Sequence, residues 1–286
     1  CLTKCRAHKP PARRIHTIKA MSIPITLTVL GCGSSSGSPA IGCACPTCVS
    51  GNPKNQRTRC SAWLSINGQG WLIDTGPDLR QQALRENLPR VDGVLYTHPH
   101  ADHLNGIDDL RAFCYRQQSV IPVYGNTFTI ANITHRFDYA FLPAHAHWNK
   151  PVLSAHTLPE SEHRQPVMQL NGVPLWHHGL PHGRWTTSAY RIGNIAWLTD
   201  INHISDAVIT ALQGLDYLFL DCLMEAAYPS HLSVAQAFDF AQRIGAKQTY
   251  FIHMTHQLEY QALSRRCPPN MAVAYDGLRI SSEWEA

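Results

Sequence analysis

The sequence predicts an α/β sandwich folded as a single domain. Strand patterns come in two groups, one in each half of the chain, and helical patterns fall within both groups. The chain has 286 residues and is 44% hydrophobic, which is enough to build a sizeable core. No repeat and no linker divides it, so we expect one domain over residues 22–286.

The N-terminal group begins with a strand at 25–30, where apolar residues alternate with threonine. A short turn at Asn67-Gly68-Gln69 predicts a hairpin. The strands expected in this group cover 25–30, 61–66, 70–75, 91–96 and 120–124, with helices at 77–87 and 106–115.

The C-terminal group contains the clearest helix, an amphipathic pattern at 233–244 with Ser233 as its N-cap. A second helix is expected at 205–213. The strands expected in this group cover 173–177, 186–192, 195–199, 217–220, 249–253 and 271–274. The pattern is weak from 126 to 166, where we expect a lid or insertion.

The charge of the chain is unevenly distributed. The net charge is +4, but residues 1–20 hold six basic residues and no acidic one. The rest of the chain therefore has 18 basic and 20 acidic residues, a net charge of −2. This balance disfavours a nucleic-acid partner. We expect 1–21 to be a flexible basic tail or upstream sequence, without the apolar region of a secretory signal. With no run of 18 apolar residues, no membrane span is predicted, and we expect a cytoplasmic protein.

Three of the ten cysteines form a C-x-C-x-x-C cluster, Cys43, Cys45 and Cys48, in a loop rich in glycine and proline. Without a secretion signal, such spacing favours metal ligands over disulfides. Three thiolates need a fourth ligand to complete a tetrahedral zinc site. Redox-active or merely reduced thiols are the alternative.

The decisive motif is Thr97-His98-Pro99-His100-Ala101-Asp102-His103, at the end of a predicted strand. Imidazoles and a carboxylate crowded into six residues can serve two metal ions, because successive side chains point in different directions. The alternative is an exposed polar loop.

This motif, with Asp74 ending the preceding hairpin, resembles the metallo-β-lactamase-fold hydrolase superfamily. The resemblance implies an αββα sandwich and two catalytic divalent ions, with Zn²⁺ and Mn²⁺ equally suited. One ion would bind to His98, His100 and His182, the other to Asp102, His103 and His253, and Asp200 would bridge them. His177 and His178 are the competitors of His182.

His231 resembles the histidine that phosphodiester-cleaving members of the superfamily place opposite the metals, as a general acid or a phosphate clamp, and with Asp102 it is an expected catalytic residue. The C-x-C-x-x-C and H-x-H-x-D-H motifs, together with His253-Met254-Thr255-His256-Gln257, resemble the phosphoribosyl 1,2-cyclic phosphate phosphodiesterases of the carbon–phosphorus lyase pathway, a branch of that superfamily. His256 would complete one structural Zn²⁺ site with Cys43, Cys45 and Cys48. The resemblance implies a hydroxide bound between the two metals that hydrolyses small cyclic phosphates or similar phosphodiesters.

Rival functions remain open at this point. A tRNA 3′-processing endonuclease shares the metal motif but carries a long arm between the equivalents of His182 and Asp200, where this chain has 17 residues. A relative from pyrroloquinoline-quinone biosynthesis shares the cysteine loop but lacks an intact histidine motif. A thioester hydrolase, a β-lactamase and a non-catalytic metal-binding scaffold are further alternatives. For assembly, an isologous homodimer is the default expectation.

Overall fold

The computed structural model describes residues 22–142, 153–161 and 165–285. The predicted tail at 1–21 therefore lies outside the described residues, as do 143–152 and 162–164 of the stretch in which we expected a lid.

The first sheet has seven strands in the order β14-β1-β2-β3-β4-β5-β6. Strands β14 to β3 run antiparallel to their neighbours, and β3 to β6 run parallel. The β2–β3 hairpin turns at Asn67 and Gly68, which both have positive φ. The strands are β1 (Ser22–Gly31), β2 (Ser61–Ile66), β3 (Gln69–Ile73), β4 (Gly93–Leu95), β5 (Ile121–Gly125), β6 (Leu153–Thr157) and β14 (Arg279–Glu285).

The second sheet repeats this plan in the order β13-β12-β11-β10-β9-β8-β7. Its strands β7 to β10 are antiparallel to their neighbours, and β10 to β13 are parallel. The strands are β7 (Met168–Leu170), β8 (Val173–His182), β9 (Trp185–Ile192), β10 (Ile195–Leu198), β11 (Tyr217–Asp221), β12 (Gln248–Ile252) and β13 (Met271–Val273).

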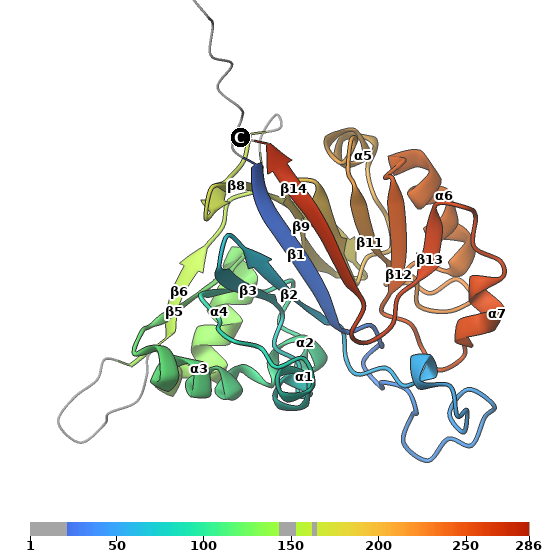
Figure 1. Ribbon diagram of the computed structural model, residues 1–286, viewed down its shortest axis with the longest axis horizontal. Coiled ribbons are helices and arrows are strands. Elements are labelled where there is room, and N and C mark those ends of the chain that lie inside the picture. The colour runs from blue at the N-terminus through green and yellow to red at the C-terminus, as the bar shows by residue number, and fades with distance from the viewer. Residues whose placement is uncertain (1–21, 143–152, 162–164, 286) are drawn as a thin grey trace, which may run out of the picture.

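Helices cover the outer face of each sheet, so the molecule is an αββα sandwich, as predicted (Figure 1). The helices of the first half are α1 (Leu79–Arg85), α2 (Ala101–Leu104), α3 (Leu110–Gln117) and α4 (Thr127–Arg136). Those of the second half are α5 (Asp206–Ala211), α6 (Val234–Ile244) and α7 (Tyr260–Ser264). Short 3₁₀ turns lie at Pro53–Asn55, Ile107–Asp109 and Asp138–Ala140. Among the described residues, no helix is long and apolar enough to cross a membrane.

The main core fills the space between the two sheets and extends under α6. Leu27 and Leu64 of the first sheet and Trp197 and Phe219 of the second are completely or almost completely buried in it. A second apolar cluster lies between the first sheet and its helices. Burial of these apolar surfaces is the dominant force that holds the sheets face to face, and it fixes the strand ends that carry the polar residues described below.

The structure contains elements that the sequence patterns did not predict, among them β7, β14, α2 and α7. The stretch at 126–166, where the pattern is weak, contains α4 and β6 among its described residues. Helix α4 starts at the N-cap Asn126, which accepts a hydrogen bond from Thr129 N, and β6 is held by parallel pairing with β5. Strand β8 continues past the expected end at His177 to His182 because it pairs with β9 along its whole length.

Candidate metal centre

The candidate metal centre lies where the carboxyl ends of strands from both sheets meet. Asp74 follows β3, the loop carrying His98 to His103 follows β4, and His182 ends β8. Asp200 and His253 lie just beyond the ends of β10 and β12. Asp74, Asp200 and His253 have φ of 63°, 56° and 59°, a left-handed conformation that non-glycine residues rarely adopt. Such strained positions are common at functional sites.

The structure brings His98, His100 and His182 together. One donor nitrogen from each lies within 4.8 Å of the other two. The Nε2 of His98 and the Nδ1 of His100 are 2.8 Å apart, so the two rings face the same point. His177, the proposed competitor of His182, lies elsewhere, with its ring nitrogens 2.7 Å from Pro159 O and 2.9 Å from Ser188 Oγ.

Asp102, His103 and His253 form a second group of three donors within 4.8 Å. The Nε2 of His103 is 3.3 Å from Asp102 Oδ2, and the Nε2 of His253 is 3.8 Å from the same oxygen. These are the three residues that the family resemblance assigned to a second ion.

Asp200 lies between the two groups. Its Oδ2 is 3.2 Å from His103 Nε2, and its Oδ1 is 3.3 Å from His253 Nε2. The same Oδ1 is 3.8 Å from the Nε2 atoms of both His98 and His182. A single carboxylate therefore touches ligand candidates of both groups, which is the position a bridging residue needs.

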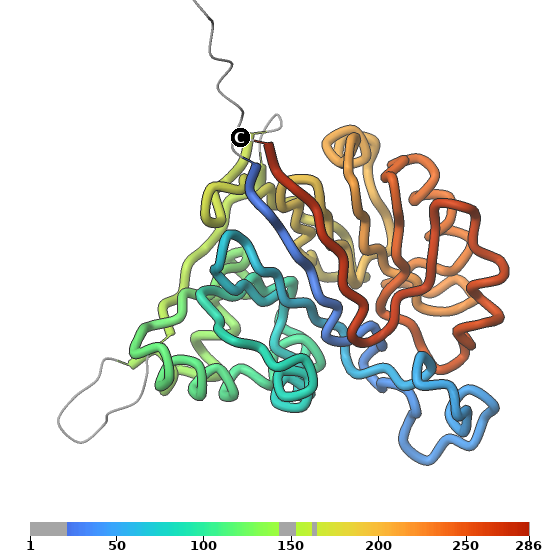
Figure 2. Tube along the Cα trace, in the orientation of Figure 1, coloured from blue at the N-terminus to red at the C-terminus, as the bar shows by residue number. Residues whose placement is uncertain are grey.

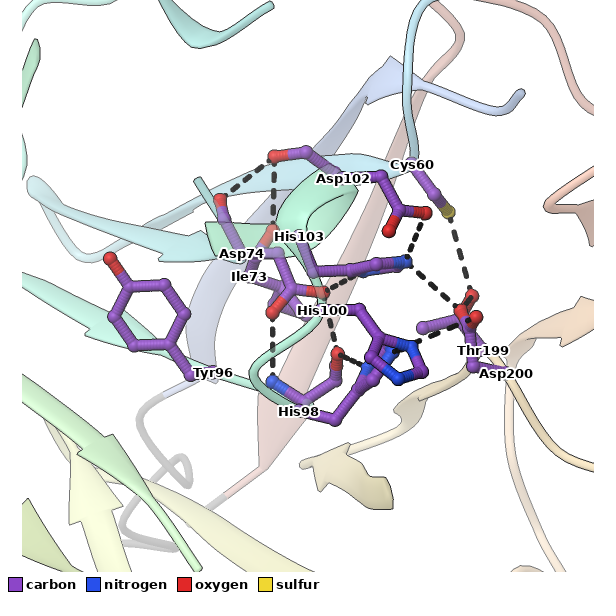
Figure 3. A network of polar contacts seen from close by, with 12 residues as sticks. Cys60, Ile73, Asp74, Tyr96, His98, His100, Asp102, His103, Thr199 and Asp200 are labelled. Carbon is purple, nitrogen blue, oxygen red and sulfur yellow. Dashed lines mark hydrogen bonds and ion pairs between the residues drawn. The ribbon is translucent and has the colours of Figure 1, made fainter. Parts of the chain in front are cut away.

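Outer hydrogen bonds fix the ring orientations (Figure 3). Asp74 accepts from His103 Nδ1 at 2.7 Å and from Thr97 Oγ1 at 2.7 Å, and Thr97 Oγ1 in turn lies 3.0 Å from His98 Nδ1. His182 Nδ1 donates to Ser230 O at 2.8 Å. Each of these rings therefore uses Nδ1 on the protein and turns Nε2 toward the centre. Metal-binding histidines are held in this way.

The electrostatics of the centre suit a cation. Burial lowers the pKa of His98 well below its usual value, so this ring is a neutral base. Although burial opposes it, the nearby His253 and His103 hold the pKa of Asp200 well below its usual value. Burial alone would lower the pKa of His103, but the pKa is raised well above its usual value by the charges of Asp200, Asp102 and Asp74. The surrounding carboxylates therefore favour positive charge at this position.

Three buried nitrogen atoms of the centre lack a hydrogen-bond partner in the described part of the chain. They are the Nε2 of His103 and both ring nitrogens of His253. Buried polar atoms without partners are rare in folded proteins, and they mark sites where an ion or ligand binds. A set of imidazoles and carboxylates fits divalent ions such as Zn²⁺ or Mn²⁺.

Asp221 also belongs to the candidate centre, although no sequence motif singled it out. It ends β11 and is fully buried, and it accepts hydrogen bonds from Leu232 N at 2.8 Å and from His231 Nδ1 at 3.3 Å. Its Oδ1 also lies 3.4 Å from His253 Nδ1. A signal was present, because Asp221 follows a buried apolar strand just as Asp200 does.

His231 faces the metal centre from the second half of the chain. Its Nε2 is 3.8 Å from Asp200 Oδ1, and its ring centre is 4.8 Å from that of His182. Burial lowers the pKa of His231, but its hydrogen bond to Asp221 and the charges of Asp221 and Asp200 outweigh this and raise the pKa above its usual value. The structure thus places an imidazole with a raised pKa beside the candidate ligands.

The cysteine cluster and His256 form a separate group of four donors within 4.8 Å. The Nδ1 of His256 is 3.5 Å from Cys43 Sγ and 3.3 Å from Cys45 Sγ. The hydrogen bond with His256 lowers the pKa of Cys45 to about 6, so its thiolate forms readily near neutral pH. Three sulfurs and one imidazole match a closed tetrahedral zinc site.

This loop lies against a segment far away in the sequence, next to α7 (Figure 2). The buried Arg57 donates to Thr255 O at 3.0 Å and to Leu258 O at 2.6 Å. Met254 N donates to Cys32 O at 3.0 Å. The cysteine group is therefore connected directly to the segment that carries His253.

A family model described as the beta-lactamase superfamily domain matches residues 71–254. The chain belongs to this superfamily. A metallo-β-lactamase-fold chain of this kind is a metal-dependent hydrolase, as its sequence predicted.

The superfamily relatives include a solved diphosphatase from the PhnP family, with 36% identity and a TM-score of 0.83 over 93% of this chain and 100% of that one. Zn²⁺-bound PqqB from Methylobacterium extorquens (17% identity, TM-score 0.74) is matched over 89% of this chain and 99% of its own. The short form of human tRNase Z (18% identity, TM-score 0.67) is matched over 89% of this chain and 98% of its own. The last two share the fold.

A curated relative from Porphyromonas gingivalis, named as an octanoyltransferase, is 35% identical over 253 residues. The match covers 87% of this chain but 50% of the relative, so this chain spans about half the length of that protein.

Proposed function

We propose that this hydrolase is a metal-dependent phosphodiesterase that cleaves small cyclic phosphates or similar phosphodiesters. The observation that carries the proposal is the His231–Asp221 pair, a proton donor held beside the candidate metal ligands. The 36% identity to a diphosphatase supports cleavage of a phosphorus–oxygen bond.

In this proposal, His98, His100 and His182 hold one divalent ion, and Asp102, His103 and His253 hold the other, with Asp200 between them. Zn²⁺ and Mn²⁺ both suit these donors. Two such ions, when bound, supply an activated water and neutralise charge on the phosphate oxygens. The Cys43, Cys45, Cys48 and His256 group would hold a structural zinc.

His231 acts as the general acid in this scheme. Its Nδ1 donates to Asp221, which fixes the ring and leaves Nε2 directed at the centre. The raised pKa favours the protonated ring, and the proton on Nε2 passes to the leaving oxygen as the ester bond breaks. Asp102, the other predicted catalytic residue, contributes as a ligand that also contacts His103.

The structure supports a small substrate over tRNA. Residues 183–199, between His182 and Asp200, are all described, and strands β9 and β10 with their short turns account for them. This position therefore offers no arm with which to grip an RNA. A cytoplasmic location and a homodimer stay predictions from the sequence.

A second candidate function is hydrolysis of an acyl thioester. One observation favours it, because the Porphyromonas gingivalis relative is named as an octanoyltransferase. A dedicated acid such as His231 matters less for a thiolate, which leaves without a proton, so the geometry favours the diester.

The experiment compares wild type with His231→Ala on a 2′,3′-cyclic nucleotide and on bis-p-nitrophenyl phosphate. Loss of a general acid should reduce turnover of the cyclic nucleotide by about 10²–10⁴-fold. The activated ester should lose much less, because its leaving group needs no proton. The matched control is His203→Ala, an exposed histidine outside the centre.

Four results would contradict the proposal. If His231→Ala loses turnover equally on both esters, or keeps rates near wild type, His231 is not the general acid. Turnover of octanoyl-coenzyme A without turnover of any diester would favour the thioester function. Two or more bound ions per chain without hydrolysis of any ester would indicate a non-catalytic scaffold.

A further inference from the structure

We propose that Phe128, Arg184 and Trp185 form a base-binding wall beside the metal centre, and that this wall binds the planar nucleobase of a nucleoside phosphodiester. The inference rests on the proposed phosphodiesterase function and names its substrate class. It is carried by the position, exposure and chemistry of these three side chains.

Trp185 is placed beside the metal centre by the β8–β9 hairpin. It is the first residue of β9 and pairs directly with His182, the last residue of β8 and a candidate ligand. Its ring also meets another candidate ligand, because the ring centres of Trp185 and His100 are 6.3 Å apart with an edge-to-face angle of 86°. Trp185 therefore borders the same side of the centre as His100.

Phe128 extends the wall from a different element. It lies in the first turn of α4, and its ring centre is 4.9 Å from that of Trp185 with the planes tilted by 33°. Asn126 Nδ2 donates to Thr186 O at 3.4 Å and links the start of α4 to β9. Phe128 is 42% exposed among the described residues, although it lies beside a largely buried polar centre.

Arg184 adds a cation to this aromatic surface. It occupies the hairpin turn between His182 and Trp185, it is exposed, and its Cζ lies 4.8 Å above the Trp185 ring. Aromatic rings and guanidinium planes together are the surfaces on which proteins stack nucleobases. The positive charge of Arg184 also suits a substrate that carries phosphate.

The wall and the proposed acid contact different histidines of the centre. Trp185 contacts His100, whereas His231 packs against His182 with ring centres 4.8 Å apart. A base bound at the wall therefore lies beside His100 and does not displace His231. A cyclic phosphate that carries only a small polyol would leave the exposed Phe128 ring in water, so the wall favours a substrate with a base.

The test uses two substrates that share a five-membered cyclic phosphate, adenosine 2′,3′-cyclic phosphate with a base and glycerol 1,2-cyclic phosphate without one. Stacking on one aromatic residue is worth about 1–3 kcal/mol per base, or about 5- to 150-fold. Trp185→Ala and Phe128→Ala should lower kcat/KM for the adenosine substrate by about 10-fold, mainly through KM. Both variants should stay within about twofold of wild type on the glycerol substrate, and Trp185→Phe should recover most of the loss.

Tyr115→Ala is the matched control, because Tyr115 is a 48% exposed aromatic residue on α3, an element that gives no residue to the centre. This variant should leave kcat/KM for both substrates at the wild-type value. Equal losses on the two substrates in Trp185→Ala and Phe128→Ala would overturn the wall, because they would show an effect on the metal centre rather than on base recognition.

A binding measurement separates this inference from the proposed function. Titration calorimetry with the metal-loaded protein should show tighter binding of AMP than of ribose 5-phosphate, and Trp185→Ala should abolish the difference. If wild type hydrolyses no diester but shows this difference, the proposed function fails and the wall stands. Equal binding of the two ligands by wild type overturns the wall.

Discussion

Three aspartates of the centre have the same carboxylate but different tasks, which their neighbours determine. Asp200 faces nitrogens of both candidate ligand groups. Asp74 accepts from His103 and Thr97, and Asp221 accepts from His231 and a backbone amide. At the scale of single residues, Asp200 is suited to bind a cation, whereas Asp74 and Asp221 orient the rings of His103 and His231.

The role of Asp221 leads to a prediction about pH. Its charge and hydrogen bond raise the pKa of His231, and a general acid works only while protonated. The activity that depends on His231 is therefore present below its pKa and is lost as the pH rises through it. In Asp221→Asn the basic limb of the kcat/KM profile should move to lower pH, and turnover of a 2′,3′-cyclic nucleotide should fall about 10- to 100-fold.

The activated ester provides the control for this variant. Bis-p-nitrophenyl phosphate needs no leaving-group proton, so its rate in Asp221→Asn should fall much less. A basic limb that stays where it is in wild type would show that Asp221 does not set the protonation of His231.

At the scale of elements, the loop that carries His98 to His103 depends on two close glycine contacts. A Cβ on Gly76 would lie 2.2 Å from Asp102 O, and a Cβ on Gly106 would lie 2.1 Å from Gly76 O. Both contacts involve backbone atoms, which cannot rotate away. The loops after β3 and β4 therefore pack against each other with no room for a side chain, and this packing positions Asp102 and His103.

Gly76→Ala should disturb the centre more than the fold. The methyl group has to displace the backbone at Asp102, so we expect a loss of stability of about 1–3 kcal/mol. Bound metal should decrease by at least one ion per chain, and turnover should fall more than about 10-fold. Metal analysis and urea unfolding measure these effects.

The control for Gly76→Ala is Gly51→Ala, where a Cβ meets nothing within 4 Å. It should keep wild-type metal content and stability. Wild-type metal content and turnover in Gly76→Ala would show that the loop tolerates displacement and that its packing does not position the ligands.

The strands with strong apolar patterns could be predicted from the sequence, and the pairing-dependent ones could not. Strands such as β1 and β11 are buried on the sandwich interior and carry a local signal. Strand β14, by contrast, alternates serine and charged residues with Ile280 and Trp284, and it forms by pairing with β1 from the other end of the chain. Local patterns contain no information about such a distant partner.

The candidate site likewise combines residues with a local sequence signal and residues that come together only in the folded chain. The motif from His98 to His103 follows a predicted strand, so its residue types were enough to indicate a metal centre, whereas only the family resemblance indicated His182, Asp200 and His253. The base-binding wall left no such signal, because Phe128 and Trp185 meet only through the packing of α4 against the β8–β9 hairpin. Positive φ at Asp74, Asp200 and His253 was equally unreadable from the sequence.

At the scale of the whole molecule, the centre joins the two halves of the sandwich. His98, His100, Asp102 and His103 come from the first half, whereas the remaining ligand candidates come from β8, β10 and β12 of the second half. Asp200 lies against candidates from both halves. Bound ions would therefore hold the two sheets in register as well as support chemistry.

The most direct test of the dinuclear centre is the metal content per chain of purified wild type, measured beside Asp200→Ala. We expect two ions in the histidine–aspartate centre and one zinc in the cysteine group, three in all. Asp200→Ala should keep only the zinc, whereas the control Asp216→Ala, an ion-paired residue outside the centre, should keep all three. Three ions in Asp200→Ala, or a single zinc in wild type, would contradict the dinuclear centre.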